Sequence, residues 1–283
     1  MFIATDAPQD ELILKLLPVL VEANAILNEE FQHYCAGEHF DIHTKSDQSP
    51  VTQADYRVNE YITTQLNALF PYLPILSEEG QHNVRKQWSK FWLLDPLDGT
   101  KEFIQQRPQF TLNLSLIDTH QTIFSVLTIP AEHLIYICPL QGLPLKYDTQ
   151  QKCWWIYAAQ HSNKLVVGVS HSAQKKQAYT DYLAALQQLI EFDVYKAGSA
   201  YKFCMMLEDQ VDLYPRFHPT CEWDTSAGQC LLERVGGGLV DFSNRSFIYN
   251  ARDELLNGGF IAYKNENIRE LAFQALALDQ SAD

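Results

Sequence analysis

The chain has 283 residues, of which 46% are hydrophobic and 20% are charged, a composition that is ordinary for a globular protein. Its length allows one large domain or two moderate ones with a substantial core. The formal net charge of −14 argues against nonspecific binding to nucleic acid or to an anionic membrane.

The cysteines and the N-terminal sequence indicate in which cellular compartment the protein is expected. The six cysteines form no C-x-x-C motif and no zinc spacing, so buried free thiols in a reducing compartment are expected. The first residues lack a basic region followed by an apolar core, and no segment has the length and apolarity of a membrane span. We therefore expect a soluble, cytoplasmic protein, a monomer or homodimer. A peripheral contact with the cytoplasmic face of the inner membrane stays open.

The first half of the chain predicts two helices and then a mainly antiparallel sheet. A helix is predicted over 10–33, followed by a polar loop that includes 45–50. A second helix is predicted from Thr52 to Phe70, in which Asp55 takes the acidic position of a capping box. Short apolar runs predict strands at 73–76, 91–97, 111–118, 123–129, 133–138 and 153–158.

In the second half, short strands and helices alternate. The pattern predicts a strand at 165–169, helices at 173–190 and 225–235, a strand at 259–263 and a closing helix at 267–278. This change of pattern indicates two stacked subdomains. We expect an α+β unit over 1–163 and an α/β unit over 164–283, with the boundary near 160–164.

The most informative stretch is an acidic turn at the end of the apolar strand 91–94. It delivers two carboxylates, Asp95 and Asp98, around Pro96, which lacks an N–H and forces the strand to stop. Two buried charges are costly unless they are neutralised. Mg²⁺ neutralises such charges well, because it takes carboxylate and carbonyl oxygens as ligands. The turn therefore indicates a magnesium site, with an ordinary Asp-Gly turn as the alternative.

Further acids lie elsewhere in the chain. Glu78 and Glu79 precede a glycine after a short apolar strand, and Asp224 precedes the helix predicted at 225–235. Each has an ordinary explanation, since paired glutamates often form solvated turns and aspartate is a common N-cap. A helix N-terminus also orients a carboxylate and favours a nearby phosphate.

Three motifs in this order resemble the inositol monophosphatase superfamily of Mg²⁺-dependent, Li⁺-sensitive phosphatases. They are Glu-Glu-Gly, Asp-Pro-Leu-Asp-Gly-Thr and Trp-Asp-x-x-Ala-Gly, and the resemblance covers roughly residues 10–263. The stretches 46–55, 92–104 and 198–204, the last followed by 213–217, are more specifically similar to bacterial 3'(2'),5'-bisphosphate nucleotidases of the CysQ type. One departure is at 198–201, where these relatives usually have two serines and an aliphatic residue. The resemblance implies a layered αβαβα sandwich of two stacked subdomains.

The resemblance also implies a ligand set for two or three Mg²⁺ ions. The metal ligands would be Glu78, Asp95, the backbone carbonyl of Leu97, Asp98 and Asp224. Glu78 and Thr100 would orient the attacking water, with Asp55 supporting Thr100. Backbone N–H groups of Gly99 and Thr100 would hold phosphate oxygens. The substrate would therefore contact Leu97, Asp98, Gly99, Thr100 and Asp224. Glu79 would order its loop or join a weaker third metal site.

A second phosphate would separate a bisphosphate nucleotidase from an inositol phosphatase. Lys202, on a predicted helix, and Arg216, on a predicted strand, are the two cations that the resemblance assigns to a 5'-phosphate, with the Ser199 hydroxyl beside them. The alternative is that Lys202 is an exposed charge on a helix and Arg216 a charge on an edge strand. The departure at 198–201 keeps Lys202, so it affects packing more than charge.

The favoured function is hydrolysis of adenosine 3',5'-bisphosphate to AMP and phosphate, which clears a by-product of sulfate assimilation. The expected partner is thus a small nucleotide. Inositol monophosphatase or fructose bisphosphatase activity uses the same chemistry and stays open. A non-catalytic regulator that binds RNA or RNA polymerase is a third hypothesis, which the intact acids and the charge of −14 oppose.

Overall fold

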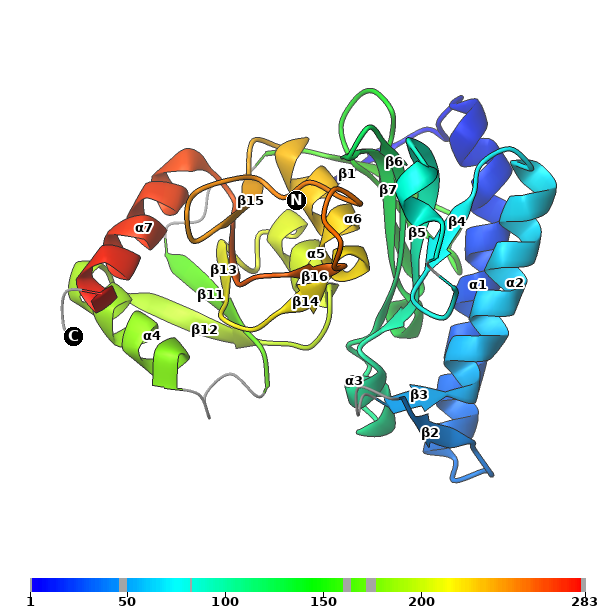
Figure 1. Ribbon diagram of the computed structural model, residues 1–283, viewed down its shortest axis with the longest axis horizontal. Coiled ribbons are helices and arrows are strands. Elements are labelled where there is room, and N and C mark those ends of the chain that lie inside the picture. Colours follow the sequence, from blue (N-terminus) through cyan, green and yellow to red (C-terminus); the bar gives the residue numbers. More distant parts are fainter. Residues whose placement is uncertain (1, 46–49, 82, 160–163, 172–176, 281–283) are drawn as a thin grey trace.

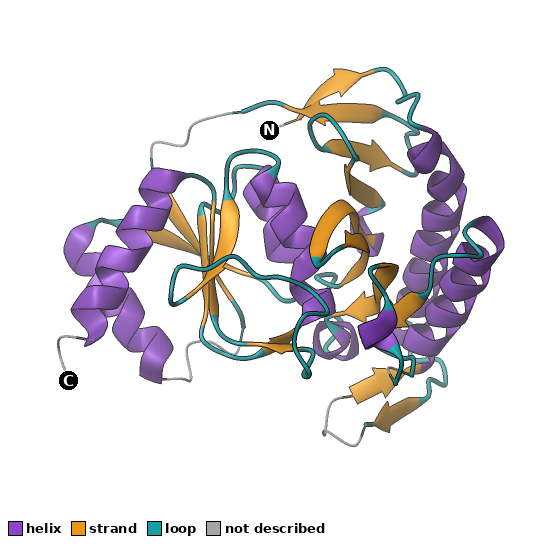
Figure 2. Cartoon of the chain, turned by 45° about the horizontal axis from the view of Figure 1, so that its top comes forward, coloured by secondary structure: helices purple, strands orange, loops and turns teal. Residues whose placement is uncertain are grey.

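The molecule consists of five alternating layers of helix and sheet. The computed structural model describes residues 2–45, 50–81, 83–159, 164–171 and 177–280. From right to left in Figure 1, the layers are the helices α1 (Glu11–Cys35) and α2 (Gln53–Leu69), an eight-stranded sheet, the helices α5 (Tyr201–Leu207) and α6 (Glu222–Glu233), a five-stranded sheet, and the helices α4 (Gln177–Leu189) and α7 (Glu266–Gln280). This order confirms the predicted αβαβα sandwich, and Figure 2 shows the same stacking from another side.

The first sheet has the strand order β1-β10-β9-β8-β7-β6-β5-β4. All neighbours are antiparallel except β4 and β5. The strands are β1 (Phe2–Thr5), β4 (Ile75–Ser77), β5 (Lys90–Asp98), β6 (Thr111–Asp118), β7 (Gln121–Ile129), β8 (Leu134–Cys138), β9 (Leu145–Asp148) and β10 (Trp154–Tyr157). The sequence did not predict β1 or β9. It also missed the hairpin of β2 (Ile42–Thr44) and β3 (Pro50–Thr52), where a loop was expected.

The second sheet is mixed and has the strand order β12-β11-β13-β17-β15. Its strands are β11 (Leu165–Val169), β12 (Phe192–Lys196), β13 (Leu213–Arg216), β15 (Gly238–Asp241) and β17 (Phe260–Tyr263). The parallel pair of β11 and β12, joined through α4, is the predicted βαβ feature. Residues 160–163 and 172–176 lie outside the described residues, and with them most of the expected subdomain boundary and the start of the predicted helix 173–190. The division into 1–163 and 164–283 stays a prediction.

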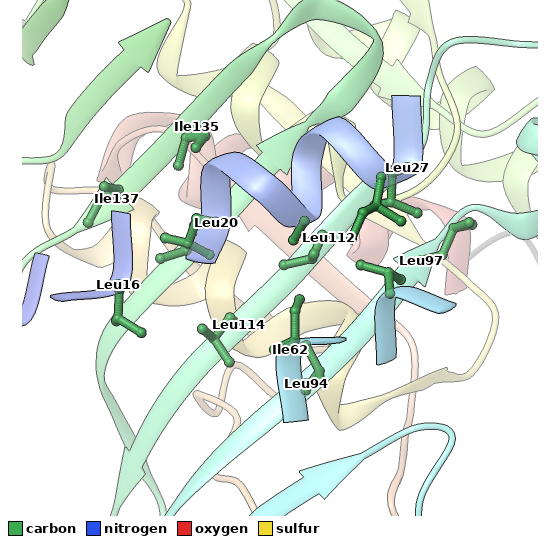
Figure 3. Packing of buried hydrophobic residues seen from close by; sticks show 14 of the residues in the cluster. Leu16, Leu20, Leu27, Ile62, Leu94, Leu97, Leu112, Leu114, Ile135 and Ile137 are labelled. Atoms are coloured by element: carbon green, nitrogen blue, oxygen red, sulfur yellow. The ribbon is translucent and has the colours of Figure 1, made fainter. Parts of the chain in front are cut away.

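One face of the first sheet packs against α1 and α2. Helix α1 begins after Asp10, whose Oδ1 accepts hydrogen bonds from the backbone N–H groups of Leu12 and Ile13 at 2.9 and 3.1 Å. Figure 3 shows the resulting core, which includes Leu16, Leu20, Leu27, Ile62, Leu94, Leu112 and Leu114. This rigid layer supports the strand that carries the acidic turn. Among the described residues, no helix combines the length and apolarity needed to cross a bilayer.

Strand β5 directs its acids toward the other face of this sheet. Trp92 and Leu94 belong to the core beneath α1 and α2, whereas Phe91 and Leu93 face a cluster that contains Trp223. Side chains alternate along a strand, so Asp95 points to the second face. The pairing register then shifts between Asp95 and Asp98, and Leu97 returns to the first core. The irregularity therefore brings Asp98 to the same face as Asp95.

Helix α6 covers that second face and begins earlier than the sequence predicts. The predicted start was Thr225 with Asp224 in front of it, but the helix begins at Glu222 and Asp224 lies inside its first turn. The Oδ2 atom of Asp224 accepts a hydrogen bond from the backbone N–H of Cys221 at 3.0 Å. Ser226 on α6 and Ser115 on β6 are joined by a 2.8 Å hydrogen bond. Asn113 on β6 also donates to the carbonyl of Trp223 at 3.3 Å, so the first turn of α6 is fixed against that strand.

The Gly228→Ala substitution is expected to destabilise the protein by about 1–3 kcal/mol through overpacking. A Cβ atom at Gly228 would lie 2.2 Å from Cδ2 of Phe203, whose ring is buried on α5. Helices α5 and α6 must then separate. Thermal unfolding measures the loss. Gly258→Ala is the matched control, because a Cβ there meets no atom within 4 Å. An unchanged Tm for Gly228→Ala would contradict this packing.

Candidate active site

The acids from β5 and α6 converge at one point. Asp95, Asp98 and Asp224 each offer a carboxylate oxygen, and these three atoms lie within 4.8 Å of one another. They form part of the wall of a cavity of about 370 Å³ between the two sheets. The same wall contains most of the other residues expected from the sequence, namely Glu78, Leu97, Gly99, Thr100, Ser199 and Arg216. The structure thus gathers acids and one predicted cation around a single cavity.

Each of the three aspartates is oriented by a backbone N–H group. Asp95 Oδ1 accepts from Leu97 N at 3.1 Å, and Asp98 Oδ2 accepts from Ala200 N at 2.6 Å. Asp224 is held by the N–H of Cys221. One oxygen of each carboxylate is thereby fixed, and the carboxylates retain lone pairs for a further ligand. Oxygen-only donors of this kind fit a hard cation such as Mg²⁺.

The charges of this cluster are costly without a cation. Burial raises the pKa of Asp95 well above its usual range, and the charges of Glu78 and Asp98 raise it further. Burial and then the charge of Asp98 likewise raise the pKa of Asp224. Burial also raises the pKa of Asp98, although the N–H of Ala200 opposes the shift. A divalent cation among the three would stabilise their ionised forms.

Asp55 lies behind the cavity and supports Thr100. As the third residue of α2 it accepts hydrogen bonds from the N–H and the hydroxyl of Thr52, at 2.7 and 2.6 Å, which confirms the predicted capping box. Its other oxygen lies 3.3 Å from the Thr100 hydroxyl. Burial raises the pKa of Asp55 to about 7, despite the opposing hydrogen bonds from Thr52. The arrangement fixes the Thr100 hydroxyl at the edge of the cavity.

In the absence of divalent cations, the stability of the fold against unfolding should decrease as the pH rises. A carboxyl whose pKa is raised on folding binds its proton more tightly in the folded state, so its stabilising effect is lost as the pH passes through the raised pKa. For Asp55 this window runs from 3.8 to about 7. We expect the Tm in EDTA to fall across it, and Mg²⁺, which binds the folded state, to restore the Tm most at high pH.

The Asp95→Asn variant isolates the cluster from other titrating groups. In EDTA at about pH 8 it should unfold at a higher temperature than the wild type, because one repelling charge is gone, and the difference should shrink at lower pH. Thermal scans of both proteins at matched pH measure this. A wild-type Tm that exceeds that of the variant in EDTA at high pH would contradict the repulsion described above.

Lys45 is a site residue that the sequence did not reveal. Its Nζ lies 2.7 Å from Glu78 Oε1 and 2.6 Å from Glu79 Oε1, at the end of β2. The ammonium pairs with both glutamates and offsets one of their two negative charges. Lys45 is 33 residues away from Glu78 in the chain, so no local pattern could indicate the contact. Its position just before the stretch 46–55 was the one available signal, and 46–49 themselves lie outside the described residues.

The two cations predicted for a second phosphate lie in different surroundings. Arg216 is on the cavity wall, where Nη1 donates to the Tyr214 hydroxyl at 3.2 Å and Nε has no hydrogen-bond partner within the described residues. Lys202 does not line the cavity. Its side chain is fully buried and donates to three backbone carbonyls. Lys202 is not exposed, and Arg216 lies on β13, which is an inner strand between β11 and β17, so that alternative is wrong.

A further cation, Lys101, lies on the cavity wall although the sequence gave it no role. It follows Thr100 in the short helix α3 (Thr100–Ile104) and is exposed. Its ammonium makes no hydrogen bond or ion pair with any residue that the structure describes. The signal that could have found it is its place in the Lys-Glu-Phe ending of the acidic motif.

Comparison with known proteins identifies the family. The model of the inositol monophosphatase family matches residues 12–277. The chain belongs to the inositol monophosphatase family. Within it, the chain is 36% identical over 231 residues to the 3'(2'),5'-bisphosphate nucleotidase CysQ of Escherichia coli K12, covering 81% of this chain and 91% of that protein. The protein of the same name from Haemophilus influenzae is 32% identical over 230 residues, covering 78% and 82%.

Solved structures of this family agree with the fold. CysQ from Bacteroides thetaiotaomicron, a bacterial member of the inositol monophosphatase family, has a TM-score of 0.75 at 27% identity and covers 91% of this chain and 99% of that chain. Inositol monophosphatase II from Staphylococcus aureus has a TM-score of 0.74 at 16% identity, covering 96% and 97%. The second likeness concerns the fold alone.

Proposed function

We propose that this member of the inositol monophosphatase family is a cytoplasmic, Mg²⁺-dependent 3'(2'),5'-bisphosphate nucleotidase that hydrolyses adenosine 3',5'-bisphosphate to AMP and phosphate. The observation that carries the proposal is the cavity, which holds the three-aspartate cluster and Arg216 on one wall. The relatives named as nucleotidases support it. In the cell the activity would clear a by-product of sulfate assimilation.

Asp95, Asp98, Asp224, Glu78 and the Leu97 carbonyl would hold two or three Mg²⁺ ions. When bound, Mg²⁺ neutralises phosphate charge and lowers the pKa of water. Glu78 would accept a proton from the attacking water, and the Thr100 hydroxyl, held by Asp55, would orient that water. Glu78 already lines the cavity, while its Oε1 accepts a hydrogen bond from Lys45.

The charge of the cavity suits a bisphosphate once cations are bound. Its wall carries five carboxylates (Glu78, Asp95, Asp98, Glu102 and Asp224) and two permanent cations (Lys101 and Arg216). Two Mg²⁺ ions change the sum of these charges from −3 to +1, and a third makes it +3. The backbone N–H groups of Gly99 and Thr100 would hold the reacting phosphate.

The second phosphate would lie against Arg216. Its Nε is buried and Nη1 donates to the Tyr214 hydroxyl, so the terminal Nη groups carry the N–H donors that a phosphate would use. The Ser199 hydroxyl and Lys101 lie on the same wall and are further donors. An inositol monophosphate has no group that requires these cations, and this is why we favour the nucleotidase over the inositol phosphatase.

A phosphate-release panel tests the function. With Mg²⁺, adenosine 3',5'-bisphosphate should be turned over much faster than inositol 1-phosphate or fructose 1,6-bisphosphate. Ca²⁺ should inhibit, because it is larger and accepts looser coordination than Mg²⁺. Inhibition by Li⁺ is expected from the family. Full activity with Ca²⁺ alone would contradict the metal assignment. If no bisphosphate releases phosphate, the non-catalytic regulator becomes the better hypothesis.

A further inference from the structure

We propose that Lys202 is a positioning residue of the active site and makes no contact with the substrate. Its ammonium holds the segment Ala197–Ala200 in the one conformation that presents a backbone N–H to Asp98. The inference rests on the proposed function, because it takes Asp98 as a metal ligand.

The hydrogen bonds of Lys202 leave it nothing to offer a phosphate. Its Nζ donates to the carbonyl oxygens of Ala197, Gly198 and Ser199 at 2.9, 2.8 and 2.9 Å. An ammonium has three N–H donors, so all are used. The ring of Tyr214 covers the same nitrogen at 4.6 Å, and the side chain has 0% exposure. Three carbonyl dipoles and an aromatic face thus replace water around a buried charge.

The backbone conformation of Ala197–Ala200 depends on contacts with other residues. Three successive carbonyls converge on one atom, and Ser199 has φ of +41°, in the left-handed region that non-glycine residues avoid. Such a conformation is strained and persists only where the surroundings fix it. Gly198 is also tightly packed, since a Cβ there would lie 2.3 Å from the Glu102 side chain. Lys202 is the group that satisfies all three carbonyls.

A single peptide group links Lys202 to Asp98. The carbonyl of Ser199 and the N–H of Ala200 belong to the same planar unit and point in opposite directions. Lys202 binds the carbonyl end at 2.9 Å, and Asp98 Oδ2 accepts from the N–H end at 2.6 Å. If this unit rotated, it would turn its oxygen toward Asp98, which repels it. By fixing the carbonyl, Lys202 therefore fixes the donor that orients this carboxylate beside Asp95 and Asp224.

Chemical labelling of the wild-type protein tests the first half of the proposal. Acetylation by an N-hydroxysuccinimide ester, read by peptide mass spectrometry, should leave Lys202 unreacted with and without adenosine 3',5'-bisphosphate. Lys101, exposed on the cavity wall, should react. A Lys202 that reacts in the free protein and is protected by the bisphosphate would overturn the proposal.

The Lys202→Met variant tests the second half. Methionine fills similar space without donors, so the peptide group loses its anchor. We expect Mg²⁺ binding, measured by calorimetry, to weaken by about 10- to 100-fold, the usual effect of removing a group that orients a metal ligand. kcat/KM should fall by the same factor on adenosine 3',5'-bisphosphate and on 3'-AMP. A loss confined to the bisphosphate, with unchanged Mg²⁺ affinity, would mean direct phosphate contact and overturn the proposal.

Lys264→Met is the matched control. Lys264 is also nearly buried, with 9% of its side chain exposed, and it pairs with Asp209 and Asp212 outside the cavity wall. The Lys264→Met protein should be less stable than the wild type but should bind Mg²⁺ with unchanged affinity. If Lys202→Met fails to fold, labelling of the wild type decides the question. If the wild type hydrolyses no bisphosphate, the proposed function fails, while the difference in Mg²⁺ affinity between wild type and variant still tests the role of Lys202.

Discussion

The Asp95→Asn substitution is expected to lower kcat by about 10³-fold, judged against the loss of ~10²–10³ for single electrostatic groups. Asp95 is one of the three aspartates of the cluster, and its buried side chain forms part of the cavity wall. An amide supplies neither the charge nor a second anionic oxygen. Phosphate release from adenosine 3',5'-bisphosphate at saturating Mg²⁺ measures the effect.

The control for Asp95→Asn is Asp118→Asn. Asp118 ends the neighbouring strand β6, is partly exposed and pairs with Lys90 at 3.1 Å. This second change also removes an aspartate charge at a strand end, yet activity should stay near that of the wild type. Turnover by a folded Asp95→Asn protein within a few-fold of the wild type would rule out the assignment of the metal site.

Replacing Arg216 by Met should change substrate choice and leave the metal requirement as it is. Arg216 is assigned to the second phosphate, and a charge-assisted hydrogen bond is worth about 1.5–3 kcal/mol net. That corresponds to a loss of roughly 10- to 150-fold in kcat/KM on adenosine 3',5'-bisphosphate. The monophosphate 3'-AMP should be affected little, because it lacks the group that Arg216 binds. Parallel kinetics on the two substrates measure this difference.

Arg245→Met controls for the loss of positive charge alone. Arg245 is exposed and pairs with Asp241 at 2.8 Å on the protein surface. Its removal should not alter the ratio of activities on the two substrates. Equal losses on both substrates for Arg216→Met would show that Arg216 supports the fold or the reacting phosphate. The nucleotidase proposal would then lose its main physical basis.

Features encoded locally were predictable from the sequence. The capping box at Asp55 is set by neighbouring residues. The prediction that Pro96 stops the strand is wrong, because β5 continues to Asp98 and its pairing register shifts between Asp95 and Asp98 instead. The strands β1 and β9 were missed because four residues carry too little pattern, and such pairing depends on distant strands. The early start of α6 escaped because its N-cap is Cys221, which is not one of the residue types that usually mark a helix start, although Asp224 completes a capping box with it.

The surroundings of Lys202 could not be predicted from the sequence. The resemblance indicated a cation near the substrate, and the local pattern indicated a helix, which the structure contains as α5. No local sequence pattern predicts the backbone conformation of 197–199, in which three carbonyl groups point toward the Lys202 ammonium. Lys45 was missed for a similar reason, because its partners lie 33 and 34 residues further along the chain.

The position of α6 also constrains how the protein can be made on the ribosome. This helix is encoded late, at 222–233, yet it covers strands that are encoded before residue 130. Until it emerges, Leu127, Ile129 and Tyr136 lack the cover that they have in the finished molecule. The nascent first sheet is therefore prone to aggregation and to chaperone capture. Asp224 arrives with the same helix, so the complete acid cluster forms only when most of the chain has been translated.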